Sequence, residues 1–170
     1  MIVIDDFIKD KEILDSFLDM EWWKNLDEGE GYDKIKKLNP DFSSNNLTFL
    51  EKLVKNLYIN FWSNYTPNYF EYWANITNEH QILDWHQDKD EKLWELENKL
   101  SLPKVGAVWY GYPHKVWGGY LEIQNEDEAA PDFERIQPLY NRVVVFDITK
   151  QHRVAPVLAG HRFGLQINLW

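Results

Sequence analysis

The spacing of apolar residues changes near residue 69, and this change constrains the fold more than any other feature. Before it, apolar side chains recur at three- and four-residue intervals, most clearly over residues 46–62, which predicts amphipathic helices. After it, short runs of aromatic and branched residues are separated by prolines and glycines, which is typical of strands joined by turns. Helices followed by many short strands predict an α+β fold, mainly β, whose strands close into a double sheet.

The elements before residue 69 are expected to brace one face of that sheet. A strand over residues 2–4 precedes a helix over about 11–22, which Asp10 would cap. Residues 24–44 are polar and contain glycines and a proline, which predicts a long loop. In the second half we expect a short inserted helix over 88–100 and strands over 69–77, 81–88, 105–110, 120–123, 142–148, 152–157 and 162–170.

Composition and length limit the protein class. No linker divides the chain, so we expect one domain over residues 1–170, with helical support over about 1–65 and a β core over about 66–170. The absence of cysteine removes disulfides, thiolate metal sites and cysteine nucleophiles. The net charge of −10, without a basic stripe, argues against a nucleic-acid partner. The sequence shows no secretory signal and no run of 18 apolar residues, so we expect a cytoplasmic protein with no membrane association; its oligomeric state is left open.

Two histidines and an aspartate form a candidate metal set. His86 and Asp88 are two residues apart at the end of an expected strand, so both side chains should point to the same face. The buried-strand pattern over 142–148 would carry the chain back beside this pair just before His152. Two imidazoles and one carboxylate occupy one face of an octahedron, which is the ligand pattern of non-haem Fe(II) oxygenases. The remaining histidines have no partner at ligand spacing: His80, His114 and His161.

Arg162 is the candidate anchor for a co-substrate. It lies ten residues after His152, across what we expect to be a tight hairpin that turns at Gly160. The planar guanidinium binds a carboxylate through two parallel hydrogen bonds, which a lysine cannot do. The alternative is an ordinary surface arginine on a strand.

The segments that carry these residues resemble the Fe(II)/2-oxoglutarate-dependent oxygenases, most closely the small prolyl-hydroxylase-like branch. The resemblance covers about residues 69–170, together with the opening residues 2–7. It rests on a His-x-Asp pair, on a Gly-Gly turn that enters a strand, and on a distal histidine followed by an arginine. These features lie in Trp85–Glu91, in Trp117–Ile123, and in His152–Val157 continuing to Gly160–Arg162.

The resemblance implies a double-stranded β-helix, or jelly roll, braced by N-terminal helices. It implies that His86, Asp88 and His152 bind Fe(II). It also implies that Arg162 pairs with the far carboxylate of 2-oxoglutarate, whose keto-acid end chelates the iron. The implied activity uses O2 to hydroxylate a C–H bond, with release of succinate and CO2, and needs no catalytic side chain beyond the metal centre.

Details of the co-substrate site depart from the family. A strand tyrosine often helps to hold the far carboxylate; Tyr110 is the best match, and Trp109 is the alternative. A small hydroxyl residue often follows the arginine by two positions, where this chain has Gly164. Residues 111–113 also differ from the usual Leu-Asn. Asp88 is intact, whereas halogenating relatives have a small residue there, so the resemblance favours hydroxylation.

The substrate and two alternative functions stay open. Segments 24–44 and 124–138 are acidic candidates for the rim of the site, which would favour a cationic or neutral substrate such as a peptidyl side chain or a small molecule. One alternative is a cupin-like metalloprotein without 2-oxoglutarate, which would not need Arg162. The other is a non-catalytic jelly-roll module that binds sugars through the abundant aromatic residues, nine each of Trp, Tyr and Phe.

Overall fold

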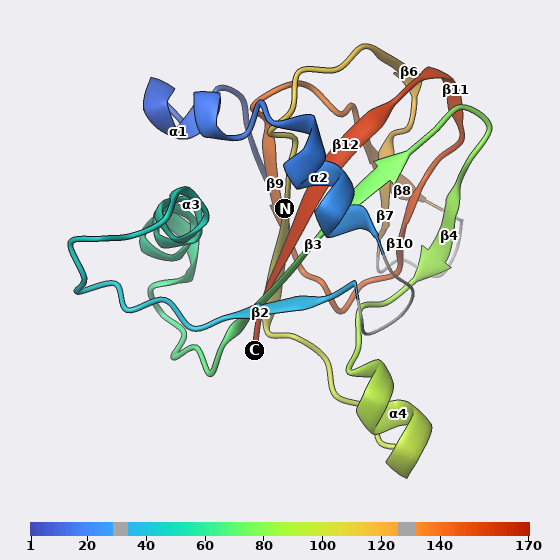
Figure 1. The fold of residues 1–170 in the computed structure, drawn as a ribbon. Coiled ribbons are helices and arrows are strands. Elements are labelled where there is room, and N and C mark those ends of the chain that lie inside the picture. Colours follow the sequence, from blue (N-terminus) through green and yellow to red (C-terminus); the bar gives the residue numbers. More distant parts are fainter. Residues whose placement is uncertain (29–33, 126–131) are drawn as a thin grey trace.

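The computed structural model describes residues 1–28, 34–125 and 132–170 (Figure 1). In chain order its elements are β1 (Ile2–Ile4), α1 (Lys11–Ser16), α2 (Met20–Asp27), β2 (Lys36–Leu38), α3 (Phe49–Leu57), a π-helical turn (Tyr58–Trp62), β3 (Phe70–Thr77), β4 (Leu83–His86), α4 (Glu91–Glu97), β5 (Val105–Trp109), β6 (Val116–Gly118), β7 (Leu121–Gln124), β8 (Phe133–Ile136), β9 (Val143–Phe146), β10 (His152–Val154), β11 (Val157–Gly160) and β12 (Arg162–Leu169).

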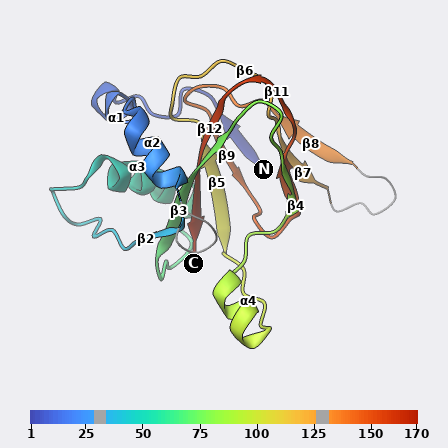
Figure 2. The same cartoon turned by 45° about the vertical axis from the view of Figure 1, so that its right-hand side comes forward.

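Two antiparallel sheets face each other. The larger has the strand order β1-β9-β5-β12-β3-β2, the smaller has the order β4-β10-β7-β8, and β6 and β11 form a two-stranded ribbon. Figures 1 and 2 show α1, α2 and α3 on the outer side of the larger sheet, with the smaller sheet opposite its inner side. The expectation of a mainly β fold with a few helices is confirmed. Among the residues described, no helix is long and apolar enough to cross a membrane.

The helix expected over residues 11–22 is two helices. The Asp10 side chain accepts hydrogen bonds from two backbone N–H groups of the first turn of α1, which ends at Ser16. Asp19 then caps α2 in the same way, through the backbone N–H of Glu21. A short acidic side chain bonds the backbone locally and favours a helix start over a helix interior. The helical spacing of apolar residues therefore continues across residues 17–19, although the helix is interrupted there.

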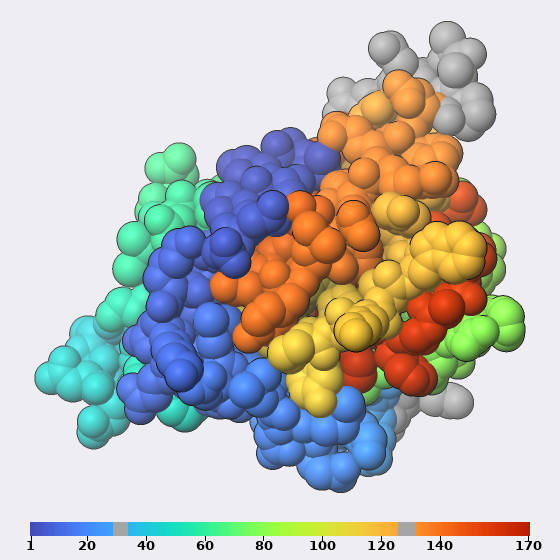
Figure 3. Space-filling model, turned by 90° about the horizontal axis from the view of Figure 1, so that it is seen from above, coloured from blue at the N-terminus to red at the C-terminus, as the bar shows by residue number. Residues whose placement is uncertain are grey.

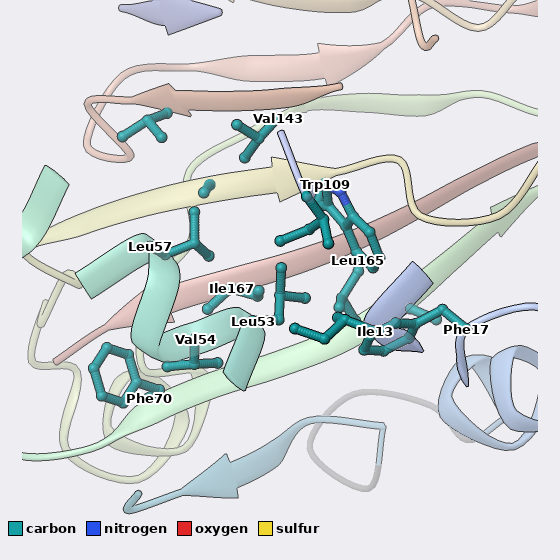
Figure 4. Packing of buried hydrophobic residues seen from close by; sticks show 14 of the residues in the cluster. Ile13, Phe17, Leu53, Val54, Leu57, Phe70, Trp109, Val143, Leu165 and Ile167 are labelled. Atoms are coloured by element: carbon teal, nitrogen blue, oxygen red, sulfur yellow. The ribbon is translucent and has the colours of Figure 1, made fainter. Parts of the chain in front are cut away.

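The helix expected over 46–62 is present in shorter form as α3. Thr48 and Glu51 form a reciprocal capping box that fixes its start, and the chain widens into the π-helical turn beyond Leu57. Its apolar face packs on the outer side of the larger sheet, as predicted. Figure 4 shows this contact, in which the side chains of Leu53, Val54 and Leu57 on α3 lie over Leu165 and Ile167 on β12.

Some short strands were not expected. β2 lies inside the segment predicted as a loop over 24–44 and pairs with the start of β3, and α2 reaches Asp27 within that same segment. β6 and β8 are also additions. Strands of three or four residues carry too little periodicity to be seen in a sequence, because pairing to a neighbouring strand decides them.

The hairpin expected between His152 and Arg162 is wrong in its topology. The strand expected over 152–157 breaks at Pro156, which has no backbone N–H to donate. β10 stays in the smaller sheet, whereas β11 pairs with β6. Gly160, at φ +82°, then turns the chain so that β12 enters the larger sheet between β3 and β5. His152 and Arg162 therefore belong to opposite sheets.

The space between the sheets is divided into an apolar and a polar side. Residues of β5 and β9 pack on residues of β7 and β8 in one apolar cluster. The polar side chains of the interior gather between β3, β12, β4 and β10, beside apolar residues such as Trp73 and Leu83. The N-terminal segment closes the outer edge beside β9, where Asp5 binds the Arg142 guanidinium at 2.5 and 2.9 Å. From above, this segment lies against the chain near β8 and β9 (Figure 3).

Candidate metal centre

His86 and His152 lie directly opposite each other in the smaller sheet. His86 ends β4, His152 begins β10, and the strand register pairs the two residues, with ring centroids 4.4 Å apart. Asp88 follows β4 by two residues. Its Oδ1 lies 3.6 Å from His86 Nε2 and 3.7 Å from His152 Nε2. The ligand atoms all lie within 4.8 Å of one another. The fold thus brings together the three residues singled out in the sequence, as one cluster that could hold a metal ion.

Hydrogen bonds on the far side of each ring orient the two imidazoles. His86 Nδ1 lies 2.7 Å from the backbone oxygen of Asp84, and His152 Nδ1 lies 3.0 Å from that of Lys150. A carbonyl oxygen only accepts, so each Nδ1 must carry the proton and donate it. In the neutral imidazole this leaves the lone pair on Nε2, which faces Asp88 and is available to a metal.

Asp88 is oriented by two polar residues of β12. Asn168 Nδ2 donates to Asp88 Oδ2 at 2.8 Å, and Gln166 Nε2 donates to Asn168 Oδ1 at 2.7 Å. The outer carboxylate oxygen is thereby occupied while Oδ1 faces the imidazoles. Gly106 leaves room for the side chain of Asn168, since a Cβ at position 106 would lie 2.6 Å from Asn168 Oδ1.

The protonation states suit metal binding. Burial lowers the pKa of His86, and the neighbouring charge of His152 lowers it further, so the neutral imidazole is favoured. Burial alone would raise the pKa of Asp88, but hydrogen bonding and charge from His152, with smaller contributions from Asn168 and His86, outweigh it and hold that pKa below its ordinary value. A carboxylate at Asp88 and a neutral imidazole at His86 are the forms that bind a divalent cation.

Arg162 is buried without a balancing charge. It is 2% exposed, at the start of β12. Its Nη2 donates to Tyr110 Oη at 3.2 Å, and its guanidinium lies 5.1 Å from the centroid of the Tyr110 ring. Its Nε has no hydrogen-bond partner, and no carboxylate pairs with it within the described ranges. An unpaired buried charge is costly, so this arrangement suits an anionic ligand.

The sequence left open whether Tyr110 or Trp109 lies beside Arg162, and what the presence of Gly164 means for the site. Tyr110 points into the space between the sheets, whereas Trp109 packs in the apolar cluster under the helices, so Tyr110 is the residue beside the arginine. At Gly164 a Cβ would lie 3.0 Å from Arg162 Nη1. The guanidinium thus lies over the position where relatives often carry a hydroxyl residue.

A sequence profile places the chain in a family. The profile of the 2OG-Fe(II) oxygenase superfamily matches residues 68–170. The chain belongs to this superfamily. The matched region begins just before β3. It contains the three candidate metal ligands and Arg162.

Solved structures of low sequence identity share the fold of this oxygenase. A prolyl-4-hydroxylase of Pseudomonas putida superposes with a TM-score of 0.66 at 16% identity, over 99% of this chain and 90% of the other. HygX of Streptomyces hygroscopicus, solved with nickel and 2-oxoglutarate, gives 0.62 at 14%, over 99% and 80%. A prolyl hydroxylase of Trichoplax adhaerens, in complex with a peptide fragment of hypoxia inducible factor, gives 0.56 at 15%, over 99% and 82%. A comparison with curated protein sequences gave no match.

Two spaces meet at the metal set of this oxygenase. A narrow inner cavity is lined by all three candidate ligands and, farther along, by Arg162. A more open groove of about 330 Å³ shares His86 and Asp88 with that cavity and extends toward the start of α4. The metal set therefore borders both the inner cavity and the open groove.

The oxygenase site also contains residues that sequence reasoning missed. Asn168 and Gln166 were read only as part of a strand, although polar residues at alternate positions in an otherwise apolar strand are a detectable signal. The imidazole of His114 lines neither space but lies near Tyr110, with ring centroids 6.3 Å apart; burial lowers the pKa of His114, and the charge of Arg162 also lowers it. His80 and His161 lie outside both spaces.

The rim segments expected from the sequence are only partly described. Lys34 and Ile35, from the segment 24–44, line the open groove. Residues 29–33 and 126–131, which belong to the two expected rim segments, lie outside the described residues.

Proposed function

We propose that this chain is an Fe(II)- and 2-oxoglutarate-dependent dioxygenase that hydroxylates a C–H bond of a peptidyl or small-molecule substrate. The observation that carries the proposal is the pairing, in one cavity, of a His-Asp-His cluster with a buried arginine that lacks a counter-ion. Membership of the superfamily supports it. The cupin-like alternative would leave the charge of Arg162 without a purpose.

His86, Asp88 and His152 would hold the metal. Two imidazole nitrogens and one carboxylate oxygen suit Fe(II), and three protein ligands leave positions free for small molecules. When bound, Fe(II) and 2-oxoglutarate supply the chemistry that uses O2 to hydroxylate the substrate, with release of succinate and CO2. The contribution of the chain is to fix the geometry of the ligands, to exclude water and to position the substrate.

Arg162 and Tyr110 would hold the far carboxylate of 2-oxoglutarate. The guanidinium provides parallel donors and the charge that a dicarboxylate requires, and the Tyr110 hydroxyl adds a donor beside it. The inner cavity has a volume of about 30 Å³, room for about two water molecules. Binding a five-carbon dicarboxylate therefore requires wall side chains to change rotamer, as is common on ligand binding.

We place the chain in the prolyl-hydroxylase-like branch, as one double-stranded β-helix domain with N-terminal helical support. The shared fold with the Pseudomonas and Trichoplax hydroxylases, which spans 99% of this chain, supports both statements. The peptide in the Trichoplax complex supports a peptidyl substrate as one of the two classes.

Anaerobic titration with Fe(II) and 2-oxoglutarate tests the proposal. The chelate has a weak visible charge-transfer band, which we expect near one equivalent of iron. We expect His86→Ala to abolish the band and Arg162→Gln to shift it to much higher 2-oxoglutarate concentrations. His161→Ala, which removes an exposed histidine, is the matched control and should leave it unchanged. Absence of the band in the wild-type protein would refute the proposed function.

A further inference from the structure

The open groove extends from the metal set beyond the inner cavity that contains Arg162. Its volume of about 330 Å³ lies within the range of small-ligand sites. The groove shares Trp73, Asn75, Leu83, His86 and Asp88 with the inner cavity, whereas His152 and Arg162 line only the inner cavity. A group that enters the groove therefore approaches the metal set from the side away from Arg162. This is the side left for the substrate.

Glu71 lines the groove next to the metal set. It lies on β3 directly across from Asn168, the residue that holds Asp88. Figures 1 and 2 show β3 and β12 side by side to the end of the sheets near α4. Directly opposite residues in an antiparallel pair have Cβ atoms about 5 Å apart. Asn168 therefore lies between Glu71 and the carboxylate of Asp88, as a neighbour of both.

The Glu71 carboxylate is mostly buried but weakly compensated. Its side chain is 12% exposed. Oε2 accepts a hydrogen bond from Trp170 Nε1 at 2.5 Å. Its ion-pair partner in the described part of the chain is Lys37, whose Nζ lies 3.8 Å from Oε1, beyond hydrogen-bond distance, on a side chain that is 58% exposed. Burial raises the pKa of Glu71 despite these partners, which indicates a carboxylate that lacks a strong counter-ion.

The two lysines that line the same groove already have partners. Lys34 Nζ lies 2.6 Å from Asp27 Oδ1, and Lys89 Nζ lies 3.5 Å from Glu91 Oε2. Both lysines are thus already paired with a carboxylate, whereas the ion-pair partner of Glu71 lies 3.8 Å away on a largely exposed side chain. The groove favours a cation over an anion.

We propose that the groove selects substrates that carry a positively charged group, an ammonium or guanidinium, bound by the Glu71 carboxylate beside the indole of Trp73. Trp73 lines the groove two residues from Glu71 on the same face of β3. Aromatic faces attract desolvated cations, and the net charge of −10 raises the local concentration of cations. The inference rests on the proposed function, because it assigns the groove to the substrate. The cation could belong to a free amine or to a lysine or arginine side chain of a peptide.

Matched ligand pairs test this selectivity directly. The protein is loaded with Ni(II) and 2-oxoglutarate, and binding is measured by calorimetry for N-acetyl-lysine methylamide and for N-acetyl-norleucine methylamide, which differ in the ammonium group. We expect the lysine compound to bind about tenfold more tightly, since hydrogen bonds to charged groups are the strong ones. Free lysine and free norleucine form a second pair, and whichever pair shows the preference identifies a peptidyl or a free substrate.

Variants connect the preference to Glu71. Glu71→Gln keeps the shape and an acceptor for Trp170, and we expect it to abolish the preference. Glu79→Gln removes an exposed charge outside the groove and should retain it. Lys37→Met removes the competing ammonium and should strengthen binding of the lysine compound several-fold.

The outcomes separate this inference from the proposed function. Equal binding within both ligand pairs, or a preference that survives Glu71→Gln, would overturn the cation site while the charge-transfer band still supports the oxygenase. Loss of the band in the wild-type protein would overturn the proposed function and this inference with it.

Discussion

The hydrogen bond from Asn168 to Asp88 permits a quantitative test of the candidate metal centre. Asn168→Ala removes the donor that lies 2.8 Å from Asp88 Oδ2. Asp88 then loses the contact that keeps Oδ1 turned toward the imidazoles. Removal of such an outer partner typically costs about 10- to 100-fold in metal affinity, or about 1.4 to 2.7 kcal/mol. We expect the dissociation constant for Fe(II) to rise by that factor.

The assay is anaerobic competition for Fe(II) against a chromophoric chelator. Gln166→Leu removes the donor to Asn168 Oδ1 but keeps the bond to Asp88, so its effect should be smaller, about threefold. Asn60→Ala, an exposed position on the helical side, is the control and should bind as the wild type does. Because Asn168 is fully buried, urea unfolding should also show a loss of about 1–3 kcal/mol.

The reasoning fails if folded Asn168→Ala protein binds Fe(II) within about twofold of the wild type, since the expected loss is at least tenfold. In that case Asp88 would owe its orientation to its own backbone, and the row of polar residues on β12 would serve packing alone.

Three further predictions concern the co-substrate and pH. Arg162→Gln should weaken 2-oxoglutarate binding about 100-fold or more, with Fe(II) affinity unchanged, measured by titration of the charge-transfer band. Gly164→Ala places a Cβ 3.0 Å from Arg162 Nη1 and should weaken 2-oxoglutarate binding in the same titration by about tenfold, with little change in metal affinity. Because burial, and then His152, lowers the pKa of His86 below 6.5, the folded metal-free protein binds fewer protons than the unfolded chain as pH falls. Its free energy of unfolding should therefore drop as pH is lowered from 6.5 through the folded pKa; urea unfolding should show a smaller drop in His86→Gln.

The pairing of His86 with Asp88 was predictable because its signal is local. His86 and Asp88 are separated by one residue, and the buried run over 142–148 shows in the sequence as a strand. That strand is β9 of the larger sheet, and the chain returns to the pair only after it, in β10. The structure brings them together by pairing β4 with β10. The roles of the three residues as ligands stay a prediction until metal is measured.

Other elements depend on contacts that no short window of sequence contains. The break between α1 and α2 comes from Asp19, a single residue inside a continuous apolar pattern. The departure of β11 from the smaller sheet depends on Pro156 and on its pairing with β6. The bond between Asn168 and Asp88 joins residues 80 positions apart, so neither residue alone signals the other.

The inner face of β12 unites the parts of the site, and this explains why polar residues occupy a buried central strand. Arg162, Gly164, Gln166 and Asn168 alternate along that face, spaced by about 6.8 Å, the rise of two residues in an antiparallel strand. In the proposed function they would provide, in order, the anchor for the co-substrate anion, the room for that anchor, and the two hydrogen bonds that orient Asp88. Pairing with β3 extends along the whole row, and β5 pairs in addition with Gln166 and Asn168. A one-residue slip in register would turn every member of the row toward the helices, so binding of metal, co-substrate and substrate should be lost together by any change that shifts β12.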